Sequence, residues 1–157
     1  MNTSHARKFA PVLLCLMAMP VFSAPQDEIE VERAYLNADK KDLVAQAMNL
    51  DEATAKSFWP LYNEYQEQLR RIGDRKVKLI MDYAQNYSSL SDEKARQLTD
   101  ENVTIQEDFL ALQKQYLKKF RKSFSNTVVA RYFQVENKIN AAINIGLAKN
   151  IPLVQLP

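Results

Sequence analysis

The chain has 157 residues, the length of one domain, and its 46% hydrophobic and 25% charged side chains exclude a disordered protein. Glycine occurs only at Gly73 and Gly146, and no proline lies between Pro60 and Pro152. Because the turns of a sheet protein are built largely from glycine and proline, this composition predicts an all-α fold.

Residues 1–23 have the layout of a secretory signal peptide. A positively charged start precedes an apolar run, 12–22, and the small residues Ser23 and Ala24 follow. The apolar run is too short to cross a bilayer as a helix. We therefore expect cleavage after Ser23 and export to the periplasm, with residues 24–157 forming a single helical domain that does not insert in the membrane.

Removal of the leader excludes most catalytic chemistry. Cys15 and His5 are the only cysteine and the only histidine, and both lie in the leader. The remaining chain has no thiol or imidazole, which excludes disulfides, catalytic triads and imidazole metal sites. Without Arg7 and Lys8 the 21 basic side chains fall to 19, equal to the 19 acidic ones. This neutral balance argues against nucleic-acid binding.

Apolar residues that recur every three or four positions predict four helices, at about residues 28–48, 52–87, 92–122 and 127–148. Asp51 and Ser91 are expected to cap the second and third helices, and Leu50 and Leu90 stand before these caps as staple residues. Asn126 is the expected cap of the fourth helix. An extended tail should follow at residues 150–157.

The two middle helices should form a long antiparallel helical hairpin, flanked by the shorter first and fourth helices. Each long helix reaches about 45–55 Å, and the link between them is short. Folding at this link places Arg75 beside Asp108 and Lys114 near Glu64. We expect the basic clusters to balance acids across the hairpin, and a site for polyanions or membrane surfaces is the alternative.

The shorter helices are expected to cover only the open end of the hairpin, with a core around Phe58, Tyr65, Phe109 and Phe133. The tip, about residues 70–108, is then left without cover. Its apolar residues form an expected surface for a second copy of the chain or for other proteins: Ile72, Val77, Leu79, Ile80, Tyr83, Tyr87, Leu98 and Ile105. The tail is expected to strap over the open end, or to dock on a partner as a strand.

Two segments share one local form, a leucine, a capping residue and the start of a long amphipathic helix: Leu50-Asp51-Glu52-Ala53-Thr54 and Leu90-Ser91-Asp92-Glu93-Lys94. They resemble the paired LTxxQ segments of the Spy/CpxP family of exported helical proteins. Asp51 and Ser91 stand where the family has threonine, and Thr54 and Lys94 stand in the glutamine position. Fragments such as Phe58-Trp59-Pro60-Leu61-Tyr62 are similar to a further branch of exported proteins of this kind.

The resemblance implies a cradle-shaped helical dimer in the Gram-negative periplasm. Spy-like members are ATP-independent chaperones that hold unfolding clients, CpxP-like members restrain an envelope-stress sensor kinase, and other relatives bind zinc. We therefore expect a homodimeric, Spy-like chaperone of unfolded proteins. The alternative is a CpxP-like regulatory or structural protein of envelope stress that binds one defined partner, such as a sensor kinase. We expect the chain to have no enzymatic activity, no metal site and no cofactor.

Overall fold

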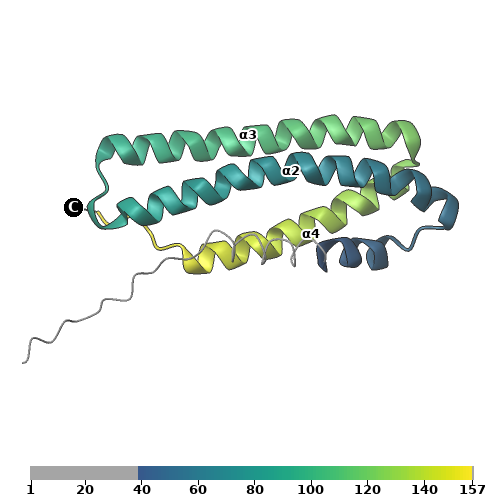
Figure 1. The fold of residues 1–157 in the computed structure, drawn as a ribbon, viewed down its shortest axis with the longest axis horizontal. Coiled ribbons are helices and arrows are strands. Elements are labelled where there is room, and N and C mark those ends of the chain that lie inside the picture. The colour runs from purple at the N-terminus through teal and green to yellow at the C-terminus, as the bar shows by residue number, and fades with distance from the viewer. Residues whose placement is uncertain (1–38, 157) are drawn as a thin grey trace, which may run out of the picture. The chain divides into compact units, whose positions relative to one another are not determined.

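The computed structural model describes residues 39–156. Residues 39–48 are helical, and they are followed by α2 (Glu52–Asn86), the short 3₁₀ helix η1 (Tyr87–Ser89), α3 (Asp92–Ser123) and α4 (Asn126–Asn150) (Figure 1). No strand occurs among the described residues, and the predicted all-α fold is confirmed. The predicted leader and the first part of the predicted helix 28–48 lie outside these residues.

Helices α2 and α3 begin at the capping residues that the sequence predicts. The Asp51 carboxylate accepts hydrogen bonds from the backbone N–H of Thr54 at 2.9 Å and from its hydroxyl at 2.7 Å. The Ser91 hydroxyl accepts the backbone N–H of Lys94 at 3.2 Å. Each bond satisfies an amide that the first turn of a helix leaves without a partner. Both caps are confirmed.

The bounds of α4 differ slightly from the prediction. Its cap is Ser125, whose hydroxyl accepts the N–H of Val128 at 3.4 Å. The predicted cap, Asn126, is wrong because this residue is already the first helical one. The helix also continues to Asn150, two residues further than expected, and it passes through Gly146. A single glycine lowers helix stability by about 1 kcal/mol without ending the helix.

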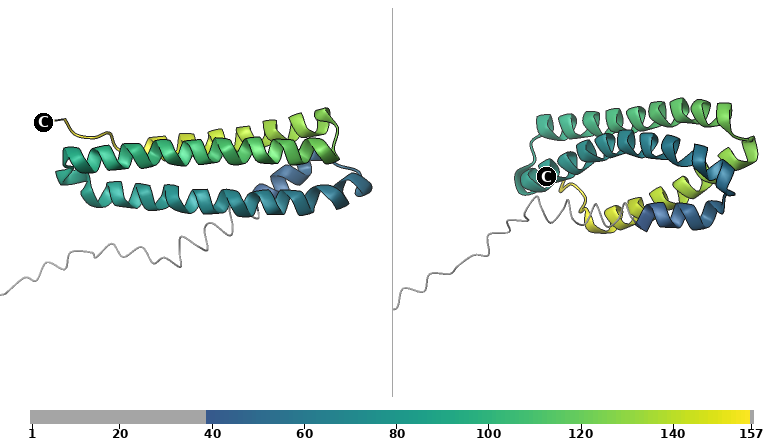
Figure 2. Two further views of the ribbon diagram at one scale, coloured as in Figure 1. Left: turned by 90° about the horizontal axis from the view of Figure 1, so that it is seen from above. Right: turned by 45° about the vertical axis from the view of Figure 1, so that its right-hand side comes forward.

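Helices α2 and α3 pack against each other (Figures 1 and 2). Arg75 of α2 pairs with Asp108 of α3, as the sequence predicts, and also with Glu101 at 3.0 Å. Nearer η1, Lys94 Nζ lies 2.7 Å from Asp82 Oδ2. Such partly exposed pairs each add little stability. They do determine which turns of α2 and α3 face each other.

Glu64 of α2 contacts the last third of α3, but through a different residue from the one predicted. Glu64 Oε1 accepts hydrogen bonds from Lys119 Nζ at 2.7 Å and from the Tyr116 hydroxyl at 2.9 Å. The predicted contact with Lys114 is wrong. Five residues separate Lys114 from Lys119, which is a rotation of about 140° around the helix. Only one of these two lysines can therefore face α2.

These contacts predict an acid-sensitive contribution to stability. The hydrogen bonds from Lys119 and then Tyr116 lower the pKa of Glu64 below its ordinary value of 4.5. The unfolded chain binds this proton more readily, so the contribution is complete above pH 4.5 and is lost as the pH falls through the lower folded pKa. In thermal unfolding, Glu64→Gln should give a shallower loss of Tm below pH 4.5 than the wild type. Parallel curves for the two proteins would contradict this assignment.

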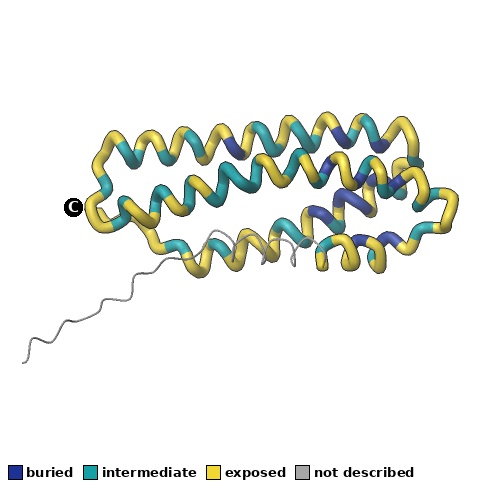
Figure 3. The backbone as a smooth tube through the Cα atoms, viewed as in Figure 1, coloured by how far each residue is buried: buried dark blue, intermediate teal, exposed yellow. Residues whose placement is uncertain are grey.

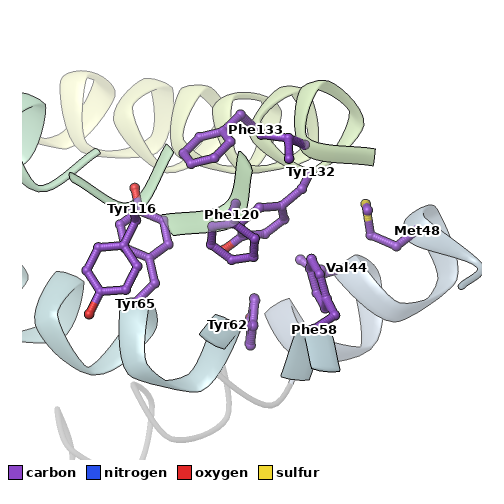
Figure 4. Close-up of a cluster of buried hydrophobic side chains, with 10 residues drawn as sticks. Val44, Met48, Phe58, Tyr62, Tyr65, Tyr116, Phe120, Tyr132 and Phe133 are labelled. Atoms are coloured by element: carbon purple, nitrogen blue, oxygen red, sulfur yellow. The ribbon is translucent and has the colours of Figure 1, made fainter. Parts of the chain in front are cut away.

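The hydrophobic core lies where α2 begins, α3 ends and α4 begins (Figure 3). The ring of Phe58 is fully buried and meets Tyr132 edge-on, with centroids 5.1 Å apart. The predicted core residues Phe58, Tyr65 and Phe133 are confirmed. The full cluster (Figure 4) contains Val44, Met48, Phe58, Tyr62, Tyr65, Tyr116, Phe120, Val129, Tyr132 and Phe133.

Phe109, which the sequence predicts in the core, lies elsewhere, and two further apolar residues of the helices are exposed. Phe109 is half-buried and outside the core cluster. Leu43 is 53% exposed because the helical residues 39–48 present only Val44 and Met48 to the core. Ile143 is 51% exposed because the buried residues of α4 all lie in its first half. The first half of α4 therefore carries the tight packing.

The expectation that the tip, residues 70–108, lacks cover is wrong. Helix α4 has 25 residues, about 37 Å at 1.5 Å per residue, which is enough to approach the tip. Lys76 of α2 donates a hydrogen bond to the Asn144 side chain of α4 at 2.8 Å. The Tyr83 hydroxyl donates to the carbonyl of Pro152 at 2.9 Å. The tail therefore lies at the tip, not over the open end (Figure 2).

Candidate protein-binding groove

An apolar groove of about 370 Å³ lies at the tip, between α2, α3, the second half of α4 and the tail. We call it the tip groove. Its walls are mostly aliphatic side chains, with a few polar groups among them. It is lined by Lys76, Leu79, Ile80, Tyr83, Leu90, Ala95, Leu98, Thr99, Asn102, Asn144, Leu147, Ile151 and Val154.

The structure brings half of the predicted surface residues together in this groove: Leu79, Ile80, Tyr83 and Leu98. Ile72 instead lines a second, smaller hollow between α2 and α3. Val77 and Tyr87 are half-buried outside both hollows, and Ile105 is buried with 4% of its surface exposed. Of the predicted staple residues, Leu90 lines the tip groove and Leu50 packs against the core.

Among the described residues, Lys76 is the charged side chain that lines the tip groove, and its sequence context does not indicate this position. Its Nζ donates to Asn144 Oδ1, and burial lowers the pKa of the ammonium group below its ordinary value. Among residues 39–156, no carboxylate oxygen lies within 4 Å of this nitrogen. The sequence around a lysine does not show whether the folded chain provides an acidic partner for it.

The tail forms one edge of the groove and is itself largely exposed. Ile151 and Val154 line the groove. Gln155 donates a hydrogen bond to the Tyr87 hydroxyl at 3.3 Å. Leu153 and Leu156 are each 88% exposed. Large apolar side chains exposed next to an apolar groove are typical of an interaction surface.

A cluster of polar side chains lies at the edge of the hydrophobic core. Glu136 of α4 is 1% exposed. Its carboxylate pairs with Lys40 Nζ at 2.9 Å and accepts a hydrogen bond from Gln66 Nε2 at 2.9 Å. Arg131, also of α4, donates to the carbonyl of Ala47 at 2.6 Å. These polar residues of α4 therefore contact other helices.

The tyrosines around Glu136 are held in their neutral form. Burial, and then the charge of Glu136, raise the pKa of Tyr62 and Tyr132 well above the ordinary value of 10. Gln66 Nε2 donates to the Tyr132 hydroxyl at 3.2 Å, so the hydroxyl is bonded without being ionised. Lys40, Gln66 and Glu136 thus join three helices, and the cluster has a structural role in holding these helices together.

Within residues 39–156, no group of three or more His, Cys, Asp or Glu residues is arranged to hold a metal ion. None of the helices described there is both long and apolar enough to span a membrane. Comparison of the chain with protein-family models, curated proteins and solved structures finds no match. The candidate site therefore rests on the geometry and chemistry of the tip groove itself.

Proposed function

We propose that this chain is an exported, periplasmic protein-binding protein of the Spy-like type, which holds unfolded clients and has no catalytic activity of its own. The observation that carries the proposal is the tip groove. Its walls are aliphatic and include the ring of Tyr83, and the exposed Leu153 and Leu156 stand beside it. Apolar surface with an aromatic anchor suits the binding of many different sequences.

The proposal also includes the antiparallel helical hairpin and the homodimer expected from the sequence. The ion pairs of Arg75 with Asp108 and of Lys119 with Glu64 support pairing of α2 with α3 as one hairpin. Self-association is supported by exposed apolar residues of α3. Val103 and Leu110 are 48% and 47% exposed, and two helical turns separate them, so they lie on one face.

Client holding can be tested by aggregation suppression with a variant of the groove wall. The wild type at near-stoichiometric amounts should keep several unrelated denatured proteins in solution. Ile80→Asn should weaken client affinity by about tenfold, or ~1.4 kcal/mol, because it removes aliphatic contacts with the client and places a polar amide against the client's apolar groups. Asparagine is preferred to aspartate because Lys76, one turn before Ile80, would pair with a new carboxylate.

The matched control is Leu43→Asn, at a residue 53% exposed and outside the groove. It should suppress aggregation as the wild type does, and circular dichroism should show both variants equally helical. A wild type that protects none of the denatured proteins would contradict client holding. Equal protection by the Ile80 variant would place client binding elsewhere on the surface.

A further inference from the structure

Within residues 39–156, no acidic side chain of the groove balances the charge of Lys76. Lys76 is the single charged side chain among the described residues that line the groove, and Asn144 is its hydrogen-bond partner. The adjacent Arg75, by contrast, pairs with both Glu101 and Asp108. Helix α3 therefore offers carboxylates to the neighbouring position but none to Lys76, as far as residues 39–156 are concerned.

A cation in this setting favours an anionic occupant. Apolar walls such as Leu79 and Leu147 remove part of the water around the Lys76 side chain, and one hydrogen bond to a neutral amide replaces only part of the lost hydration. A carboxylate that entered the groove would form a charge-assisted hydrogen bond with Lys76, in surroundings less screened than open water. The occupant should therefore be apolar along most of its length and negatively charged at one point.

The tail indicates which backbone conformation a segment bound at the tip can have. Residues 152–156 are not helical. The Tyr83 hydroxyl binds the backbone carbonyl of Pro152, and the side chain of Gln155 binds the Tyr87 hydroxyl. The tail is thus an apolar, non-helical segment that forms hydrogen bonds with the hydroxyl groups of two tyrosines. Residues 151–156 contain no acidic side chain, so no side chain of this part of the tail can form an ion pair with Lys76.

We propose that the tip groove binds an extended apolar segment of another polypeptide, and that a single carboxylate of this segment pairs with Lys76. This inference rests on the proposed function and specifies the chemistry of the clients. The apolar residues of the segment contact the aliphatic walls, and its acidic side chain lies beside Lys76 and Asn144.

The test compares two labelled peptides by fluorescence anisotropy. Both have about ten residues, mainly Leu, Val and Ile, and they differ by one Glu in place of one Gln. The wild type should bind the Glu peptide about fivefold more tightly, which is the upper end of what a partly exposed ion pair contributes. Lys76→Met, which keeps the aliphatic stem, should bind both peptides equally. Lys78→Met should keep the preference, since Lys78 is exposed and outside the groove.

The outcomes separate this inference from the proposed function. Equal binding of both peptides by the wild type, or a Glu preference that survives Lys76→Met, would overturn the inference. Aggregation suppression without binding of either peptide would overturn it and leave client holding intact. A Glu preference that depends on Lys76, without aggregation suppression, would support the inference and contradict client holding. If decanoate binds in a way that depends on Lys76 and neither peptide binds, the occupant of the groove is a small amphipathic anion. The proposal of a polypeptide occupant would then be overturned.

Discussion

Replacing Lys40 with methionine is expected to destabilise the fold by about 3 kcal/mol. The ammonium group of Lys40 lies against Glu136, whose side chain is 2% exposed, and it also donates to Gln66 Oε1 at 2.9 Å. Removal of one partner from a buried pair leaves the other charge without compensation, which typically costs 3–5 kcal/mol. Urea unfolding followed by circular dichroism measures the loss.

The double variant Lys40→Met/Glu136→Leu is the control for this prediction. It removes both charges and fills the space with apolar atoms, and such replacements are often neutral or stabilising. It should therefore recover most of the stability that the single variant loses. If Lys40→Met unfolds at the same urea concentration as the wild type, the Lys40–Glu136 pair does not hold the helical residues 39–48 against the bundle.

Phe58→Ala should have the largest effect of any single truncation in the core, about 4 kcal/mol. The Phe58 ring is fully buried. It contacts five aromatic rings at centroid distances of 5.1 to 6.1 Å, those of Trp59, Tyr62, Phe120, Phe124 and Tyr132. Truncation removes these contacts and leaves a cavity that rigid rings refill poorly, and changes of this kind cost about 3–5 kcal/mol.

Leu43→Ala provides the comparison, because Leu43 is 53% exposed and lies outside the core cluster. Its cost should stay within about 0.5 kcal/mol, as for most surface substitutions. Equal shifts of the urea midpoint in the two variants would show that the core does not lie where α2 begins and α3 ends.

The features that could be predicted from the sequence depend on neighbouring residues. A cap needs one polar side chain and an amide three residues later, so Asp51 and Ser91 could be identified directly. The stripe of Phe58, Tyr62 and Tyr65 has helical spacing, and all three residues are buried. Where two neighbouring residues both make good caps, as at Ser125 and Asn126, sequence alone does not decide between them.

The features that could not be predicted join distant parts of the chain. Lys40 and Glu136 are 96 positions apart, and neither carries a local sign of the other. The path of α4 decides whether the tip is covered, and path depends on packing angles that periodicity does not specify. The sequence therefore identified four residues of the groove, Leu79, Ile80, Tyr83 and Leu98, but neither Lys76 nor the tail edge.

The buried residues are concentrated at one end of the long helices, and this has a consequence for how the sequence of the protein can change. Every buried residue of α2 lies between Phe58 and Tyr65, and none lies in the part that forms the groove. Local opening near the groove therefore needs less free energy than unfolding of the whole domain. Substitutions in the groove wall are far from the aromatic cluster, so their effects on stability should add to those of substitutions in the cluster. The binding surface can thus diverge in sequence while the aromatic end preserves the fold.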